Sequence, residues 1–164
     1  MKKIFIILIL FLNLMGSALE EGRKAEGHYQ YDKAAKLYIK SCDEKNMQGC
    51  YYLSLLSSLG LGVKKNYKRS YSLLKQACQG DYFQACNDLG RGHILGTRGR
   101  EKNYKKAFEL FKKACNGNNA SGCLSLGTVY KNGTYVKKDQ VKSKKMYEKS
   151  CKLGSNYGCE LFKK

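Results

Sequence analysis

The chain has 164 residues, a formal net charge of +18 at pH 7, eight cysteines and no proline. This length suits one domain with a sizeable core and excludes a series of domains. The absence of proline favours helices, and the basic charge fits an anionic partner.

Residues 1–18 have the pattern of a secretory signal peptide. Two lysines precede an apolar run at positions 4–12, and Gly16 and Ala18 occupy the −3 and −1 positions of a cleavage site. The run is too short to cross the ~30 Å of bilayer hydrocarbon as a helix. We therefore expect an exported protein, periplasmic or secreted, with no transmembrane span after cleavage. The alternative is an uncleaved anchor.

Residues 19–164 form one array of repeats. The cysteines fall into four pairs with seven residues between the members of each pair, and successive pairs are offset by 36, 37 and 36 residues. A fixed period of this size with matched core positions predicts a solenoid. The predicted parts are a cap helix over 19–30 and repeats over 31–66, 67–103, 104–139 and 140–164, of which the last is truncated.

The third repeat shows the pattern most completely. Its apolar residues follow i, i+3, i+4, i+7 and i+8 spacing, which predicts the buried stripe of a helix. These residues are Ala107, Leu110, Phe111, Ala114 and Cys115. The Gly- and Asn-rich stretch 116–119 ends this helix, and a second helix is predicted from residue 120 to about residue 131. Each repeat is therefore predicted to be a helical hairpin.

The cysteine spacing provides an independent test of the hairpin. In one continuous helix the two Cα atoms of a pair would lie ~12 Å apart, whereas a disulfide needs them within ~7 Å. A bond within a pair is therefore possible only if the chain reverses between the two cysteines. An even number of cysteines in an exported chain indicates disulfides. The repeat favours Cys42–Cys50, Cys78–Cys86, Cys115–Cys123 and Cys151–Cys159.

These features resemble the Sel1-like repeats of the Helicobacter cysteine-rich protein family, which are relatives of the tetratricopeptide repeat. The residues that match are Lys106, Cys115, the run from Cys123 to Gly127, Tyr130, Gly133, Val136 and Asp139. The resemblance implies an all-α fold, a right-handed alpha-alpha superhelix of hairpins that are each stapled by one disulfide. Ser54, Gly99 and Tyr135 depart from the family pattern, which leaves the shape of the local turns open.

The resemblance also implies β-lactam binding and a weak β-lactamase activity. Ser72 and Lys75 match the S-x-x-K motif of serine β-lactamases, but the chain has no S-D-N or K-T-G motif. Ser72 also aligns with exposed helix positions in the other repeats. His93 is a weak candidate for a proton shuttle, with a surface or partly packed histidine as the alternative. The catalytic residues are therefore unknown, and the sequence alone assigns no enzyme class.

No metal and no cofactor are expected. Structural zinc sites use closely spaced ligands such as C-x-x-C, and this spacing does not occur in the chain. The two histidines, His28 and His93, are too few and too distant to form a metallo-β-lactamase site.

The leading functional hypothesis is an interaction scaffold, because solenoids present an extended concave surface. Its ligand would be a protein or peptide, or an anionic component of the cell envelope. Candidate groove residues are Tyr52, Tyr71, Phe108 and Tyr130. Nucleic acid is not expected for an exported, disulfide-bonded chain, and a monomer is expected. The alternative for the lysines is that they only solvate helix faces.

Overall fold

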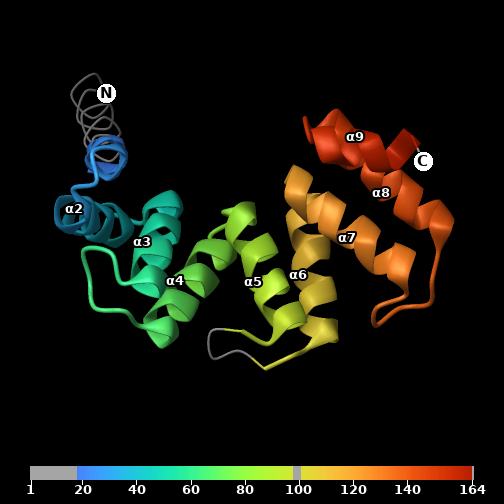
Figure 1. Cartoon of the computed structure of the whole chain (residues 1–164), viewed down its shortest axis with the longest axis horizontal. Helices are drawn as coiled ribbons and strands as arrows, with labels where there is room; N and C mark the ends of the chain where they lie inside the picture. Colours follow the sequence, from blue (N-terminus) through green and yellow to red (C-terminus); the bar gives the residue numbers. More distant parts are fainter. Residues whose placement is uncertain (1–17, 98–100, 164) are drawn as a thin grey trace, which may run out of the picture. The chain divides into compact units, whose positions relative to one another are not determined.

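The computed structural model describes residues 18–97 and 101–163, and every regular element in these ranges is a helix (Figure 1). A first helix covers residues 18–27. The others are α2 (Tyr31–Asp43), α3 (Met47–Leu59), α4 (Tyr67–Gln79), α5 (Phe83–Leu95), α6 (Tyr104–Asn116), α7 (Ala120–Asn132), α8 (Gln140–Lys152) and α9 (Asn156–Lys163). We call α2, α4, α6 and α8 the A helices, and α3, α5, α7 and α9 the B helices.

The chain divides into two compact units, Met1–Gly80 and Asp81–Lys164. The first contains the helix over 18–27 together with α2, α3 and α4, and the second contains α5 to α9. Within each unit, helices that follow each other along the chain pack against one another. The structure therefore confirms the predicted all-α repeat fold.

Polar caps and glycines set the helix boundaries. The A helices α4, α6 and α8 begin after Asn66, Asn103 and Asp139, whose side chains each accept a hydrogen bond of 2.9 Å from a backbone amide three residues later. At Asp139, the hydrogen bond from the backbone amide of Lys142, together with one from the side chain of Lys142, holds the pKa of the carboxyl group below its usual range. The B helices α3, α5 and α7 end at glycines with φ of +79°, +65° and +71°. A left-handed residue of this kind is favourable only for glycine.

The predicted stripe of the third repeat forms the core of the second unit. Ala107, Phe111 and Cys115 of α6 pack with Cys123 and Leu126 of α7, all 4% exposed or less. Leu110 is half-buried rather than fully buried. The core of the first unit is formed by Ala25, Ala34, Ala35, Tyr38, Leu53 and Leu56.

Disulfides hold the two helices of a hairpin unusually close. The Cα atoms lie 4.5 Å apart in Cys42–Cys50 and 4.4 Å apart in both Cys115–Cys123 and Cys151–Cys159. Cys78 and Cys86 are also disulfide-bonded, so none of the eight cysteines is free.

Small residues beside the cysteines permit this approach. A Cβ atom on Gly158 would lie 2.9 Å from the Cβ of Ser150, and one on Gly122 would overlap Ala114 in the same way. In each case one partner directly precedes the first cysteine of the pair and the other directly precedes the second. These small residues therefore allow the two helices to cross closely at the disulfide.

A second contact between small and large residues joins each B helix to the next A helix. A Cβ on Gly90 would lie 2.5 Å from the ring of Phe111, and one on Gly127 would lie 2.6 Å from the ring of Tyr147. Gly22 has the same relation to Tyr38. In the remaining repeat, Ser54 replaces the glycine, and a smaller Leu74 replaces the aromatic residue. The larger residue at Ser54 is thus accompanied by a smaller residue at the position that the glycine contacts in the other repeats.

The helix over residues 18–27 is attached to α2 by a partly buried hydrogen bond. The hydroxyl of Tyr38 donates to Oε2 of Glu26 at 2.6 Å, and Tyr38 is fully buried. Burial, reinforced by this bond, raises the pKa of Tyr38 far above its usual range, so the phenol remains a donor at all physiological pH values. Residues 1–17 of the predicted signal peptide lie outside the described residues. No helix in the described ranges is both long and apolar enough to cross a membrane.

We expect Tyr38→Phe to loosen this helix selectively. The substitution keeps the ring but leaves the partly buried carboxylate of Glu26 without its donor, which costs about 1–2 kcal/mol. Amide hydrogen exchange should therefore accelerate in residues 19–27 more than in α6 and α7. Uniform acceleration throughout the chain would contradict a local role for the bond.

Candidate functional site

The catalytic candidates lie in different units of the structure, Ser72 and Lys75 in the first and His93 in the second. Ser72 and Lys75 lie exposed on α4, as the alignment of the repeats predicts for Ser72. His93 is only 6% exposed, and its Nδ1 lies 3.2 Å from the backbone oxygen of Glu101. This histidine is therefore more deeply buried than a surface position, and its ring contacts a loop carbonyl. Within the described ranges, no cluster of three or more His, Cys, Asp or Glu residues could hold a metal ion.

The four aromatic candidates have different environments. Tyr52 stacks on the buried Tyr38 with a centroid distance of 5.2 Å, so it belongs to the core of the first unit. Tyr71 is half-buried on α4. Phe108 and Tyr130 lie together, edge to face at 5.9 Å. The structure therefore brings Phe108 and Tyr130 together, whereas Tyr52 contributes to the core of the first unit.

The pair is extended by Tyr135, whose ring lies 5.8 Å from that of Phe108. Tyr135 has a φ of +72°, at a position where the first repeat has Gly62 with a φ of +62°. The turn is thus left-handed in both repeats, although a tyrosine is unfavourable in this conformation. The other departure, Gly99, lies outside the described residues.

The second unit has a groove between α5 and α7, with a cavity volume of about 320 Å³. We call it the α5–α7 groove. Its apolar lining residues are Ile94, Leu95, Phe111, Leu124, Val129 and Tyr157, and its polar ones are Arg91, Ser125, Thr128, Asn132 and Thr134. A volume near the lower limit for ligand sites fits a large side chain of a partner.

Hydrogen bonds fix part of the polar lining. The hydroxyl of Ser125 donates to Oδ1 of the buried Asn87 at 2.8 Å, and that of Thr128 donates to the backbone oxygen of Leu124 at 3.0 Å. Arg91 is the charged residue of the lining, and it is exposed at the rim. The groove therefore combines apolar walls with one guanidinium group, a combination that suits an apolar anchor next to a carboxylate.

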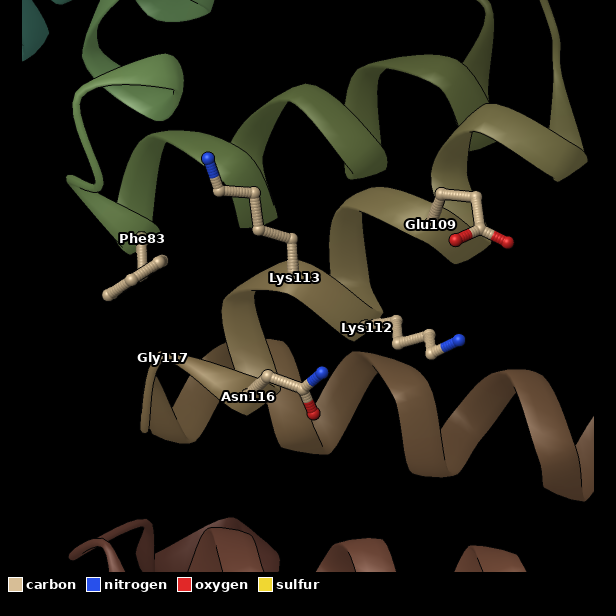
Figure 2. Close-up of a pocket in the computed structure, with 6 residues that line it drawn as sticks. All are labelled: Phe83, Glu109, Lys112, Lys113, Asn116 and Gly117. Atoms are coloured by element: carbon tan, nitrogen blue, oxygen red, sulfur yellow. The ribbon is translucent and has the colours of Figure 1, made fainter.

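A second hollow, of about 450 Å³, lies beside the carboxyl end of α6. Lys113 in this hollow pairs with Asp81 at 3.0 Å. Figure 2 shows that Lys112 and Lys113 point in different directions. Phe83 lies beside Gly117. Because its two ammonium groups do not converge, this hollow is a poorer candidate for a binding site.

The sequence did not predict the α5–α7 groove, because its walls come from two B helices that belong to different repeats. The sequence nevertheless contains one indication of this groove. Leu124 lies next to Cys123 on α7, away from the core formed by Leu126 and Val129. A helix with apolar residues on more than one face has a second packing surface or a ligand surface.

Comparisons with known proteins agree with this architecture. The Sel1 repeat family model matches residues 11–46, 48–82, 83–119 and 120–155. These matches run from a B helix to the following A helix, half a repeat out of phase with units aligned on the cysteines. A comparison with curated protein sequences gave no match.

Solved structures show the same fold. A Sel1 repeat protein from Oxalobacter formigenes has a TM-score of 0.82 and 23% identity over 90% of this chain and 62% of its own. The protein c5321, a protective antigen present in uropathogenic Escherichia coli strains, has a TM-score of 0.79 and 24% identity. Its match covers 90% of this chain and 32% of its own. The chain thus spans less than two thirds of either protein.

Cysteine-rich protein B of Helicobacter pylori is similar over nearly its whole length. Its TM-score is 0.65 and its identity 32%, over 80% of this chain and 94% of the Helicobacter protein. The Sel1 matches cover most of the chain, and its cysteines are all oxidised. The chain therefore belongs to the Sel1 repeat family, in the cysteine-rich form that the Helicobacter protein represents.

Proposed function

We propose that this disulfide-rich Sel1 repeat protein is an exported scaffold that binds a segment of a partner protein in the α5–α7 groove. The observation that carries the proposal is the groove itself, which places apolar walls and Arg91 on helices held by disulfides. A rigid site loses little conformational entropy when a ligand binds. The site can therefore bind a short segment without first having to fold.

The chemistry of the lining indicates the kind of segment. An apolar side chain would lie against Ile94, Leu124 and Val129, while Arg91 pairs with a carboxylate of the ligand. The net charge of +18 would attract an acidic partner and accelerate its association.

Reversing the charge of Arg91 should abolish this recognition. The probe is a random-peptide display library selected on the immobilised, oxidised protein. We expect selected peptides to contain Asp or Glu next to a large apolar residue. Arg91→Glu should weaken their binding by more than about tenfold, since a charged hydrogen bond contributes roughly 1.5–3 kcal/mol.

The matched control is Lys145→Glu, which changes the net charge equally at an exposed position of α8. Equal losses in both variants would indicate binding by net charge alone. Selected peptides that lack acidic residues would contradict the assigned role of Arg91.

Oxidation of all eight cysteines supports a periplasmic or secreted location, because disulfides persist in oxidising compartments. The β-lactam hydrolase alternative has no support from the placement of Ser72, Lys75 and His93. A chromogenic cephalosporin is the direct test. Turnover that requires the folded protein and is lost in Ser72→Ala would favour the hydrolase.

A further inference from the structure

One edge of the second unit differs from the rest of its surface. At this edge α5 ends and α6 begins, and α7 ends and α8 begins, so both connecting loops lie at the same end of the hairpins (Figure 1). We call residues 101–106 and 131–142 the loop edge. It borders the α5–α7 groove and contains two of its lining residues, Asn132 and Thr134. None of its lysines lines that groove, and neither do Tyr104, Tyr135 and Val141, so the inference below does not depend on the proposed function.

The loop edge concentrates positive charge. Its exposed lysines are Lys102, Lys105, Lys106, Lys131, Lys137, Lys138 and Lys142. Its acidic residues are Glu101 and Asp139, and Asp139 caps α8 and pairs with Lys142 at 3.1 Å. At the opposite edge the turns contain Asp81 as their charged residue, and the adjoining last turns of α6 and α8 contain Lys113, Lys149 and Lys152.

Helix stability does not explain these lysines. The first turns of α6 and α8 contain lysine and no acidic residue. The amino end of a helix carries partial positive charge, so lysines there are unfavourable. The first unit repeats the arrangement, since Lys68 and Arg69 lie in the first turn of α4. A placement that recurs despite its cost indicates an anionic ligand.

Exposed apolar residues lie among the lysines. Tyr104 is 44% exposed, Tyr135 is 50% exposed and Val141 is 81% exposed. Leu95, at the adjoining end of α5, is 58% exposed. Acidic polymers offer nothing for such side chains to contact, whereas tyrosine and branched apolar residues suit the boundary between lipid headgroups and acyl chains.

We propose that the loop edge binds the surface of an anionic phospholipid bilayer. Lysines would contact the headgroup phosphates, while Tyr104, Tyr135 and Val141 enter the interfacial region. This mode is peripheral, because it uses loops and helix ends rather than a spanning helix.

Vesicle flotation tests the proposal with the oxidised protein lacking residues 1–18. The vesicles contain phosphatidylcholine alone or phosphatidylcholine mixed with phosphatidylglycerol. We expect binding only to the anionic vesicles, with a partition coefficient that falls as salt is added. Lys105→Glu with Lys106→Glu and Lys138→Glu should lower it by more than about 100-fold, since each lysine contributes roughly fivefold.

A matched variant tests whether binding depends on the lysines of the loop edge or only on the net charge of the protein. Lys112→Glu with Lys145→Glu and Lys163→Glu makes the same charge change at exposed lysines elsewhere in the unit. It should retain most of the binding. Equal losses in the two variants, or no binding by the unmodified protein, would overturn the proposal. Thermal unfolding of both variants establishes that they are folded.

A third variant distinguishes lipid from a soluble polyanion. Tyr104→Ser with Tyr135→Ser and Val141→Ser should lower vesicle binding about tenfold and make the remainder more sensitive to salt. If this variant binds vesicles as well as the unmodified protein, and soluble polyglutamate competes fully, the ligand of the edge is an acidic polymer and the lipid proposal fails.

Discussion

Replacing Cys115 and Cys123 together by alanine should lower the free energy of unfolding by about 4 kcal/mol. Opening a closed loop of this length accounts for roughly 2.6 kcal/mol through the entropy of the unfolded chain. The rest comes from lost packing, because the two cysteines are 2% and 0% exposed and belong to the core of the second unit. Thermal unfolding should show a fall in Tm of more than about 8 °C.

The bond between Cys151 and Cys159 provides the matched control. Its two cysteines have the same sequence separation of eight residues, so the entropic contribution is equal. Both cysteines are only half-buried, so their packing contribution is smaller. Removing this bond should lower stability by about 2–3 kcal/mol. A loss equal to that at Cys115–Cys123 would show that burial of the sulfur atoms contributes nothing.

The second large effect is expected for Gly127→Ala. The new methyl group would lie 2.6 Å from Cε1 and 2.7 Å from Cδ1 of Tyr147, and 3.3 Å from Cβ of Met146. Overpacking of this kind costs 1–3 kcal/mol or more, against a gain of about 1 kcal/mol in helix propensity. We expect a net loss of about 2 kcal/mol in denaturant unfolding.

Two further variants define the cause. Gly27→Ala should be neutral or slightly stabilising, since a Cβ at Gly27 would meet nothing within 4 Å. Adding Tyr147→Leu to Gly127→Ala imitates the pair of Ser54 and Leu74 in the other unit. The double variant should be more stable than the sum of the two single changes predicts. Strict additivity would contradict a direct clash between the two positions.

Much of this fold could be predicted from the sequence because its determinants are local. The stripe from Ala107 to Cys115 and the polar stretch that follows it, residues 116–119, define a helix and its end within a short segment. The spacing of the cysteines requires a reversal of the chain between them. Family membership then follows, because the same hairpin recurs along the chain.

The candidate site was less predictable because its determinants are not local. Tyr52 occupies a helix face that suits a groove, but its ring stacks on Tyr38, 14 positions earlier in the sequence. The α5–α7 groove joins Arg91 and Ile94 to residues about 30 positions later. Periodicity identifies the face of a helix on which a residue lies, but not the neighbour that this face contacts.

The disulfides also determine which fragments a protease would release from the protein. Exposed lysines such as Lys64, Lys65, Lys137 and Lys138 lie in the loops between hairpins, where a protease specific for basic residues has access. The turn between Cys115 and Cys123 contains no basic residue. In the first unit the corresponding turn contains Lys45, but a cut there leaves both helices joined through Cys42–Cys50. Digestion therefore releases closed hairpins, and the two helices of each separate only after a reductant reaches them.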